Sequence, residues 1–207
     1  MADEEQSFEN NGFKTVEQAL AFGGAIFGRS EDFDVAIDHV LTLLTDAVVL
    51  FEGQSFGSAA FLAITAMEET AKAHVGSFRH DNPGPRPKGR DPFRDHTAKH
   101  SMAILPTVFM SHRIVDALGR DRAKALEREA QETGFTITRE AGLYCARGPN
   151  GFESPKTAIP ARLAWELSIL AIAAADDALV GYTNHSYQVG EEFESLFARL
   201  LTQRPLG

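Results

Sequence analysis

The chain has one cysteine and no long hydrophobic run. Because Cys145 is alone among 207 residues, an intramolecular disulfide and a cysteine-rich zinc site are both excluded. The sequence contains no stretch of about 18 apolar residues, the length that a membrane-spanning helix needs. Residues 1–10 hold four acidic residues and no lysine or arginine, unlike the basic start of a secretory signal. We therefore expect a cytoplasmic protein that does not associate with membranes.

Net positive charge is also missing. The formal net charge is −9 at pH 7, which argues against indiscriminate coating of nucleic acid, because phosphate binding needs concentrated lysine and arginine. Basic residues are nevertheless concentrated in residues 79–100, which hold six Lys or Arg, three of the seven histidines and three aspartates. A proline- and glycine-rich loop, residues 80–90, lies within this stretch. We expect three of its basic side chains to bind RNA phosphates: Arg86, Lys88 and Arg90.

Apolar residues recur at the spacing of amphipathic helices along most of the chain. The two strongest predicted helices are joined at Gly53 and should pack antiparallel, because only a few residues connect them. The helices predicted are, in order, a short one from the Thr15-x-x-Gln18 capping box toward Phe27, one from Ser30 or Asp32 to Gly53, one from Ser55 to Phe78, one from Asp91 toward Leu118 with a kink or an end at Pro106, and others over 121–132, 160–180 and 193–200.

The pattern predicts an all-α fold, a bundle of four or five principal helices. Residues 135–158 interrupt it, because threonine and glycine are frequent there and Gly148-Pro149-Asn150-Gly151 is a turn signal. We expect a small hairpin or irregular excursion in that range. The predicted domain organisation is a flexible acidic N-terminus, residues 1–12, followed by one helical domain over residues 13–203.

Residues 91–100 crowd reactive side chains into a predicted helix start. Asp91 suits the N-cap, and Pro92 suits the first helical position, where its missing N–H has no partner to lose. His96 and His100 are four residues apart and share one helix face. Arg94 precedes His100 by six residues, which on a regular helix means about 9 Å along the axis and about 120° around it. One helix therefore does not bring Arg94 and His100 together.

Three motifs occur in a fixed order along the chain: Glu68-Glu69-x-x-Lys72 late in a predicted helix, Phe93-x-x-His96-x-x-Lys99 at the next helix start, and Arg139-Glu140 with Leu143-Tyr144 before an apolar helix. In this order and helical setting, over residues 35–180, the chain resembles the AbiV abortive-infection family. That family is grouped with the HEPN superfamily of small helical, often dimeric, nucleotide-binding or RNA-cleaving proteins.

The resemblance implies a phage-defence effector, a toxin that acts as a homodimeric endoribonuclease. Ribonucleases of the superfamily carry an arginine, a polar residue, a few spacers and a histidine, a pattern that Arg94-Asp95-x-x-x-x-His100 fits. The site residues that it implies are, as catalytic groups, Arg94, His100 and His96 and, as supporting groups, Glu68, Lys72, Lys99 and Asp95.

Histidine and arginine suffice for RNA cleavage by transesterification. A base takes the 2′-OH proton, an acid protonates the leaving oxygen, and a cation stabilises the charge that develops on phosphorus. We therefore expect no cofactor and no metal, and activity that persists in EDTA. Since Arg94 and His100 are separated on one helix, two protomers at a twofold interface would complete the site.

Several alternatives stay open at this point. Asp95–Lys99 and Glu68–Lys72 are each four residues apart, so both could be plain surface salt bridges. In the functional alternative, Glu68 orients His96 or Arg94 across the helix pair. A metal shared by Glu68, His96 and His100 is a further alternative, although the His-x-x-x-His segment lacks an internal glutamate. The chain could also be a helical scaffold, or a non-catalytic module that binds a phage protein, a host protein or an antitoxin.

Overall fold

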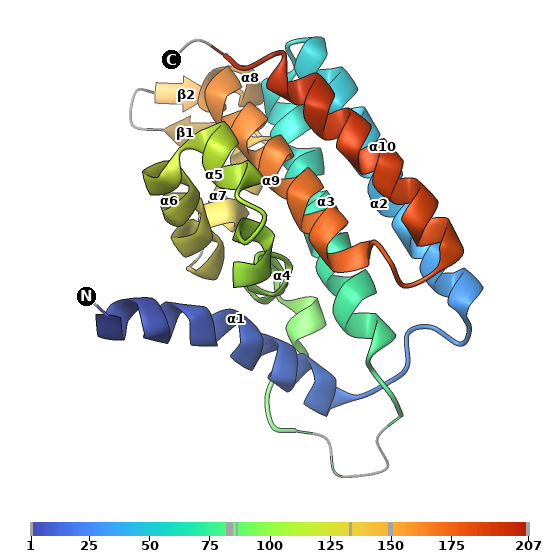
Figure 1. The fold of residues 1–207 in the computed structure, drawn as a ribbon. Coiled ribbons are helices and arrows are strands. Elements are labelled where there is room, and N and C mark those ends of the chain that lie inside the picture. The colour runs from blue at the N-terminus through green and yellow to red at the C-terminus, as the bar shows by residue number, and fades with distance from the viewer. Residues whose placement is uncertain (1, 82–84, 86, 133, 149–150, 206–207) are drawn as a thin grey trace.

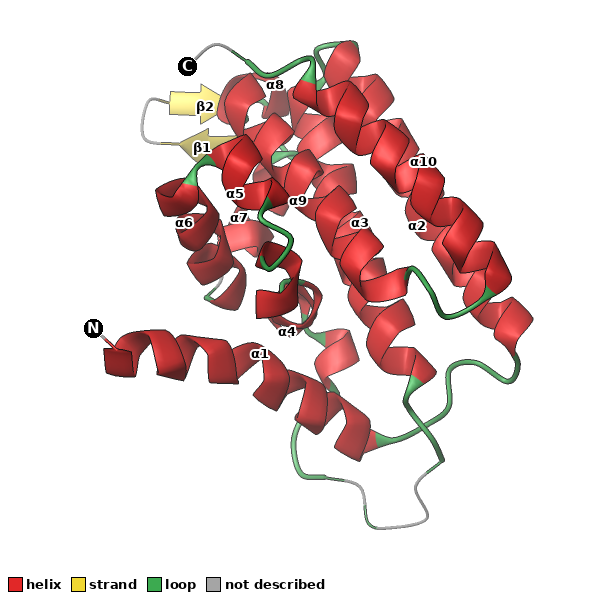
Figure 2. Ribbon diagram, viewed as in Figure 1, coloured by secondary structure: helices red, strands yellow, loops and turns green. Residues whose placement is uncertain are grey.

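The part of the chain that the structure describes is all-α apart from one two-stranded hairpin (Figure 2). The computed structural model describes residues 2–81, 85, 87–132, 134–148 and 151–205, with only the backbone described for residues 2–11. The elements, labelled in Figure 1, are α1 (Ala2–Phe22), α2 (Ser30–Glu52), α3 (Phe56–Ser77), the 3-10 turn η1 (Pro92–Arg94), α4 (His96–Ala103), the 3-10 turn η2 (Pro106–Phe109), α5 (Arg113–Leu118), α6 (Arg120–Gln131), α7 (Gly134–Ala141), β1 (Ala146–Gly148), β2 (Gly151–Glu153), α8 (Pro155–Ala158), α9 (Ala161–Leu179) and α10 (Asn184–Leu201).

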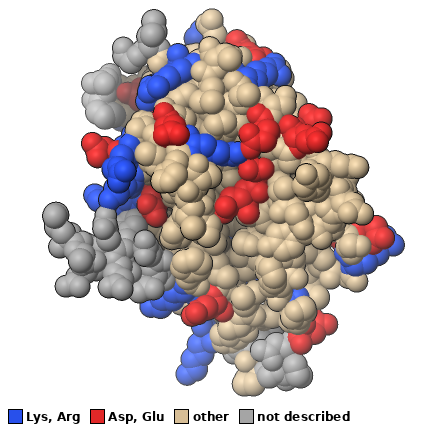
Figure 3. Space-filling model, in the orientation of Figure 1, with Lys and Arg blue, Asp and Glu red and all other residues tan. Residues whose placement is uncertain are grey.

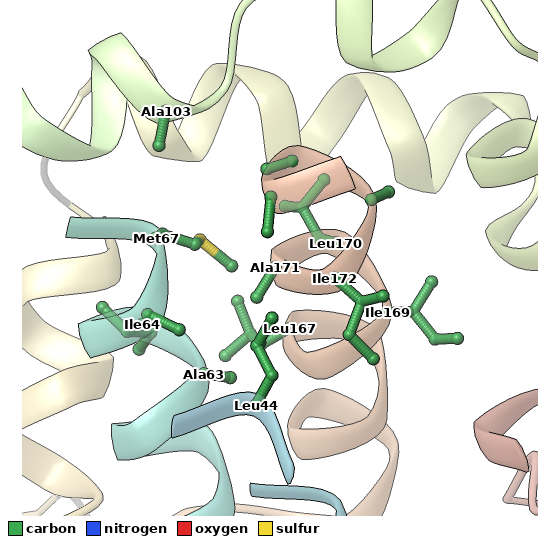
Figure 4. Close-up of a cluster of buried hydrophobic side chains, with 14 of the residues drawn as sticks. Leu44, Ala63, Ile64, Met67, Ala103, Leu167, Ile169, Leu170, Ala171 and Ile172 are labelled. Carbon is green, nitrogen blue, oxygen red and sulfur yellow. The ribbon is translucent and has the colours of Figure 1, made fainter. Parts of the chain in front are cut away.

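Four long helices, α2, α3, α9 and α10, lie side by side and enclose the main hydrophobic core (Figure 1). Figure 4 shows Leu44 of α2, Ile64 and Met67 of α3 and Leu167 of α9 gathered in one cluster. Burying such side chains stabilises the fold by about 1.5–3 kcal/mol each. Most residues of α3 and α9 are buried, so these two helices are at the centre of the fold. Among the described residues, no helix combines the length and the apolar character needed to cross a membrane.

The α2–α3 pair forms as predicted. Helix α2 ends at Glu52 and α3 begins after Ser55, with Gly53 at the connection. The rings of Phe51 and Phe56 pack against each other across the turn, with their centroids 5.4 Å apart. This contact closes the hairpin and fixes where α3 starts.

The first helix differs from the prediction. Helix α1 runs continuously through Thr15 from Ala2, and it ends at Phe22 rather than near Phe27. Gly23 and Gly24 end it, because their φ angles of 63° and 84° belong to the left-handed region that glycine adopts without strain. Helix α1 packs against α4, η1 and α6.

The helix predicted from Asp91 toward Leu118 ends before Pro106, one of the two outcomes expected there, and the segment is further divided into η1, α4, η2 and α5. The side chain of Asp91 accepts a hydrogen bond from the backbone N–H of Phe93 and caps only the short turn η1. Asp95 is extended and caps α4, since its side chain accepts from the N–H of Ala98 at 2.9 Å. Pro106 begins η2 after α4 has ended, as the lack of an N–H favours.

The range 135–158 is more helical than predicted. Residues 134–141 form α7, although threonine and glycine lower its intrinsic helix propensity. The expected hairpin follows as β1 and β2, which pair antiparallel with Arg147 opposite Phe152. Pro149 and Asn150 of the turn signal lie outside the described residues. Helix α7 packs against α3 and α4, so the excursion reaches the centre of the molecule.

Candidate functional site

The candidate site is built around one buried carboxylate. Glu68 lies on α3 directly after the core residue Met67, and only 4% of its side chain is exposed. A buried carboxylate destabilises a fold unless charged or hydrogen-bonding groups compensate it. Helix α3 therefore requires partners for Glu68 from neighbouring helices.

Helix α4 supplies three of these partners. The cap at Asp95 starts the helix, and residues one, four and five positions later share the face that meets Glu68. His96 Nδ1 lies 2.8 Å and 2.9 Å from the two carboxylate oxygens, Lys99 Nζ lies 2.5 Å from Oε2, and His100 Nε2 lies 3.2 Å from Oε1. Of the alternatives that the sequence left open, the contact of Glu68 with His96 across a helix pair is the one that the structure contains.

Helix α7 supplies a fourth basic side chain. Arg139 Nε lies 3.4 Å from Glu68 Oε1, and the guanidinium covers the ring of Phe61, 4.8 Å from its centroid. The N–H of this nitrogen makes no hydrogen bond, so Arg139 is held by charge and by the aromatic ring. We call Glu68, His96, Lys99, His100 and Arg139 the Glu68 cluster.

The cluster fixes the protonation of its members. Burial alone would raise the pKa of Glu68, but hydrogen bonds from His100 and Lys99 and the charge of Lys99 outweigh it and lower this pKa to about 2. The carboxylate is thus ionised at neutral pH and only accepts hydrogen bonds. Burial lowers the pKa of His100 despite the nearby carboxylate, so His100 is neutral. His100 Nε2 and His96 Nδ1 must then carry the protons that they donate to Glu68.

The two histidines differ in access to solvent. The side chain of His96 is 45% exposed, whereas that of His100 is 1% exposed. In a neutral His96 ring, a proton on Nδ1 leaves Nε2 as a hydrogen-bond acceptor, and no described residue bonds to it. His96 can therefore take a proton from a ligand, while His100 is confined to contacts with the protein.

Arg94 does not join this cluster. It is exposed at the end of η1, where its backbone N–H donates to the carbonyl of Asp91, and its guanidinium makes no ion pair or hydrogen bond with the described residues. With Arg79 and Arg90 it lines a cavity of about 1140 Å³ beside the end of α1. The structure thus brings together His96, His100 and Glu68 but leaves Arg94 apart from them.

Two surface salt bridges that the sequence left open, Glu68–Lys72 and Asp95–Lys99, do not form. Lys72 pairs with Glu69 at 2.5 Å rather than with Glu68, because Glu68 points to α4 and α7. Lys99 pairs with Glu68 rather than with Asp95, whose carboxylate is occupied as the cap of α4. Lys72 and Asp95 are therefore not members of the Glu68 cluster.

The predicted RNA-binding residues are only partly described. Arg90 is exposed and Lys88 is half-buried, whereas Arg86 lies outside the described residues. On the face shown in Figure 3, basic and acidic side chains are interspersed. None of the described residues form a group of three or more His, Cys, Asp or Glu side chains arranged to hold a metal ion.

Sequence reasoning assigned no role to Arg79, which organises the approach to the site. Its side chain is almost completely buried and binds Asp91 through both terminal nitrogens, at 3.1 Å and 2.6 Å. Its Nε donates to the carbonyl of Ala19 at 2.7 Å, and the guanidinium lies 3.6 Å from the centroid of Phe93. Arg79 thereby ties α1 and η1 to the end of α3. An arginine just beyond a predicted helix gives no sequence signal for such a role.

The structure defines a helical domain whose central helix carries a buried glutamate shared by histidines and cations from two neighbouring helices. Residues 31–173 match the sequence model of the AbiV family, HEPN_AbiV. The chain therefore belongs to the AbiV family, which confirms the resemblance, and the matched range contains the whole Glu68 cluster. No curated protein and no solved structure matches the chain.

Proposed function

We propose that this chain is an abortive-infection effector of phage defence that cleaves RNA without a metal ion and acts as a homodimer. Membership of the AbiV family supports the defence role, as the family's name indicates. The observation that carries the activity is the pairing of exposed His96 with buried Glu68. A carboxylate that holds one ring nitrogen of a histidine leaves the other ready for proton transfer.

The proposed reaction is transesterification at a 2′-hydroxyl. Nε2 of a neutral His96 takes the 2′-OH proton, the 2′-oxygen bonds to phosphorus, and the bond from phosphorus to the 5′-oxygen breaks. A protonated His96 from the second protomer gives its proton to the leaving 5′-oxygen. Glu68 holds Nδ1–H and stabilises the imidazolium that forms. His100 acts as a positioning residue, because it is buried against Glu68.

The separation of the candidate groups supports the homodimer. Arg94 lies outside the Glu68 cluster of its own chain, and in the proposed dimer the Arg94 of the second protomer completes the site. Light scattering at micromolar concentration should give twice the monomer mass. A strict monomer that still cleaves RNA would contradict the dimeric site.

The decisive experiment compares two exposed histidines. We expect His96→Ala to lower the rate of single-stranded RNA cleavage by at least about 100-fold, as loss of a general base does. His39→Ala on α2, where His39 is also exposed, should leave the rate unchanged. Activity should persist in excess EDTA. Cleavage that requires Mg²⁺ or Mn²⁺, together with full activity of the His96 variant, would contradict the mechanism.

The basic loop should bind the RNA backbone outside the reacting centre. Replacing Arg86, Lys88 and Arg90 together with glutamine should weaken RNA binding and flatten its salt dependence, because fewer counterions are then released. The fold should survive, since the two of these residues that the structure describes are not in the hydrophobic core. An unchanged salt slope would show that the loop is only a connection.

A non-catalytic defence module is the second candidate. It is favoured by exposed apolar side chains on α7 and the segment after it, Ile137, Leu143, Tyr144 and Phe152, which a phage protein, a host protein or an antitoxin could cover. In that case His96→Ala would keep its toxicity and its phage protection, whereas Tyr144→Ser with Phe152→Ser would lose both. The two variants therefore separate the candidates.

A further inference from the structure

Glu68 already accepts hydrogen bonds from three side chains without Arg139. A carboxylate has about four acceptor positions. The single Nδ1–H of His96 lies within reach of both oxygens, Lys99 donates to Oε2, and His100 donates to Oε1. Arg139 Nε, at 3.4 Å from Oε1, is left as a buried donor without an acceptor among the described residues. The two histidines at Oε1 give a physical reason for the missing hydrogen bond.

Arg139 also carries the positive charge of the cluster that no carboxylate balances. The carboxylate of Glu68 balances the buried ammonium of Lys99, burial lowers the pKa of His100, and His96 is in the neutral form that a general base requires. One positive charge therefore remains, on a guanidinium whose side chain is 24% exposed. Its terminal nitrogens make no hydrogen bond to any described residue. A partly desolvated arginine with free donors is suited to bind an anion.

Close packing of the backbone after α7 against the start of α3 fixes the position of Arg139. At the start of α3, a Cβ on Gly57 would lie 2.7 Å from the Cβ of Pro155, and one on Gly142 would lie 2.6 Å from the carbonyl oxygen of Gly57. Any larger residue would push α7 away from α3, so the two glycines permit the close approach. Arg139 is thus fixed by helix packing in addition to its ion pair.

We propose that Arg139 forms, together with His96, the subsite that binds the scissile phosphodiester within one protomer. Nδ1 of His96 lies 2.8 Å and Nε of Arg139 lies 3.4 Å from the same oxygen, Glu68 Oε1. These two nitrogens are therefore at most 6.2 Å apart, so the two side chains lie next to each other on Glu68. The terminal nitrogens of Arg139 can donate charge-assisted hydrogen bonds to the phosphate oxygens, while Nε2 of the neutral His96 beside them accepts the 2′-OH proton.

The proposal rests on the proposed function and adds to it a phosphate ligand from α7. Arg94, on η1, would then contact RNA from the second protomer, whereas Arg139 acts in its own chain. A planar guanidinium binds two oxygens of one phosphate, which a lysine at the same position cannot do. Replacement by lysine should therefore restore only part of the binding.

The test uses inorganic phosphate as the probe and the ring proton signals of His96 in NMR spectra as the readout. Phosphate should shift the His96 signals of the wild type, and Arg139→Met should weaken its affinity at least about tenfold, as expected for the loss of a charge-assisted pair. Arg139→Lys should give an intermediate affinity. Arg147→Met, which removes an exposed arginine from β1, is the control and should bind phosphate like the wild type. Circular dichroism would confirm that each variant is folded.

The outcomes separate this inference from the proposed function. Equal phosphate affinity in the wild type and Arg139→Met, or the same loss in Arg139→Met and Arg147→Met, would overturn the subsite. If the wild type cleaves RNA and Arg139→Met cleaves it equally well, the subsite is wrong and the ribonuclease stands. If Arg139→Met alone loses phosphate while the wild type does not cleave RNA, the subsite stands and the ribonuclease is wrong.

Discussion

Two buried glutamates on neighbouring core helices are neutralised in different ways. Glu68 of α3 meets two histidines, a buried lysine and an arginine. Glu166 of α9 has only arginines as partners among the described residues. Arg122 Nε of α6 lies 2.7 Å from its carboxylate, and Arg162 Nε, one turn earlier in α9, lies 2.6 Å from it. Both carboxylates are almost fully buried, at 4% and 5% side-chain exposure. The two carboxylates are therefore equally buried, and the clusters differ in the side chains that contact them.

The partners decide what each cluster can do. Arginine stays charged at every physiological pH, so Glu166 forms a fixed link that joins α6 to α9. Histidine changes its protonation near neutral pH, so the Glu68 cluster can exchange protons with a ligand. The arginines at Glu166 are each about one-third exposed and remain hydrated, whereas Lys99 at Glu68 is buried. The comparison predicts that the two sites respond differently to mutation and to pH.

Removal of Glu68 should have the largest effect. Glu68→Ala leaves Lys99 as a buried, unpaired charge, which should lower the free energy of unfolding by about 3–5 kcal/mol. Urea denaturation measures this loss. The double variant Glu68→Gln with Lys99→Met is the control, because it removes both charges and should recover much of the stability. A loss below about 1 kcal/mol in Glu68→Ala would show that the pair is not effectively buried.

Acid should destabilise the fold through the Glu68 cluster in two steps. The pKa of His100 is lowered by burial, so the unfolded chain binds the proton first and stability falls as the pH drops below about 6.5. The pKa of Glu68 is lowered to about 2, so its stabilisation, roughly 3 kcal/mol, is present above the ordinary glutamate pKa and is lost as the pH falls toward 2.

Urea denaturation as a function of pH measures both steps. His100→Gln should remove the first step, and Glu68→Gln should remove the second. Glu129 and Asp176 act in the opposite direction, because burial raises their pKa values, so each step is read as a difference between the wild type and a variant. Parallel curves for the wild type and Glu68→Gln below pH 4.5 would contradict the lowered pKa of Glu68.

Removal of Glu166 should cost less than removal of Glu68. Glu166→Ala leaves two arginines that water can reach, so we expect a loss of about 1–2 kcal/mol. RNA cleavage and the His96 signals should be unchanged, because the proposed site does not include Glu166. Urea denaturation and the cleavage assay measure these two expectations. A loss as large as that of Glu68→Ala would mean that exposure of the partners does not set the cost.

The sequence predicted the scaffold better than the contacts at the site. Helices α2 and α3 follow from apolar periodicity and from Gly53, which are local signals. Helix α7 was missed because its residues have low helix propensity and packing against α3 and α4 decides its conformation.

Four of the five side chains of the Glu68 cluster were among the candidates, whereas Arg139 was not, and two pairings that the spacing allowed do not form. Lys99 lies four residues after Asp95, and spacing alone predicts a salt bridge between them. In the structure, Asp95 caps α4, and Lys99 pairs with the carboxylate of Glu68, 31 residues earlier in the sequence. Burial of Glu68 outweighs the local pairing, because an unpaired buried carboxylate costs more than a surface salt bridge contributes. Which helix faces meet could not be read from the spacing within one helix.

The smallest effect is expected at Lys72, whose sequence motif suggested a place beside Glu68. Lys72 instead pairs with Glu69 on the outer side of α3, where about a third of each side chain is exposed. Such a pair contributes at most about 0.5 kcal/mol, because water screens it and two flexible side chains must be ordered. Lys72→Met should therefore change the free energy of unfolding by less than this amount and leave RNA cleavage unaltered. Urea denaturation and the cleavage assay test both expectations. A tenfold loss of cleavage in a fully stable Lys72→Met protein would show that Lys72 contacts RNA, and the site would then extend along α3 beyond the Glu68 cluster.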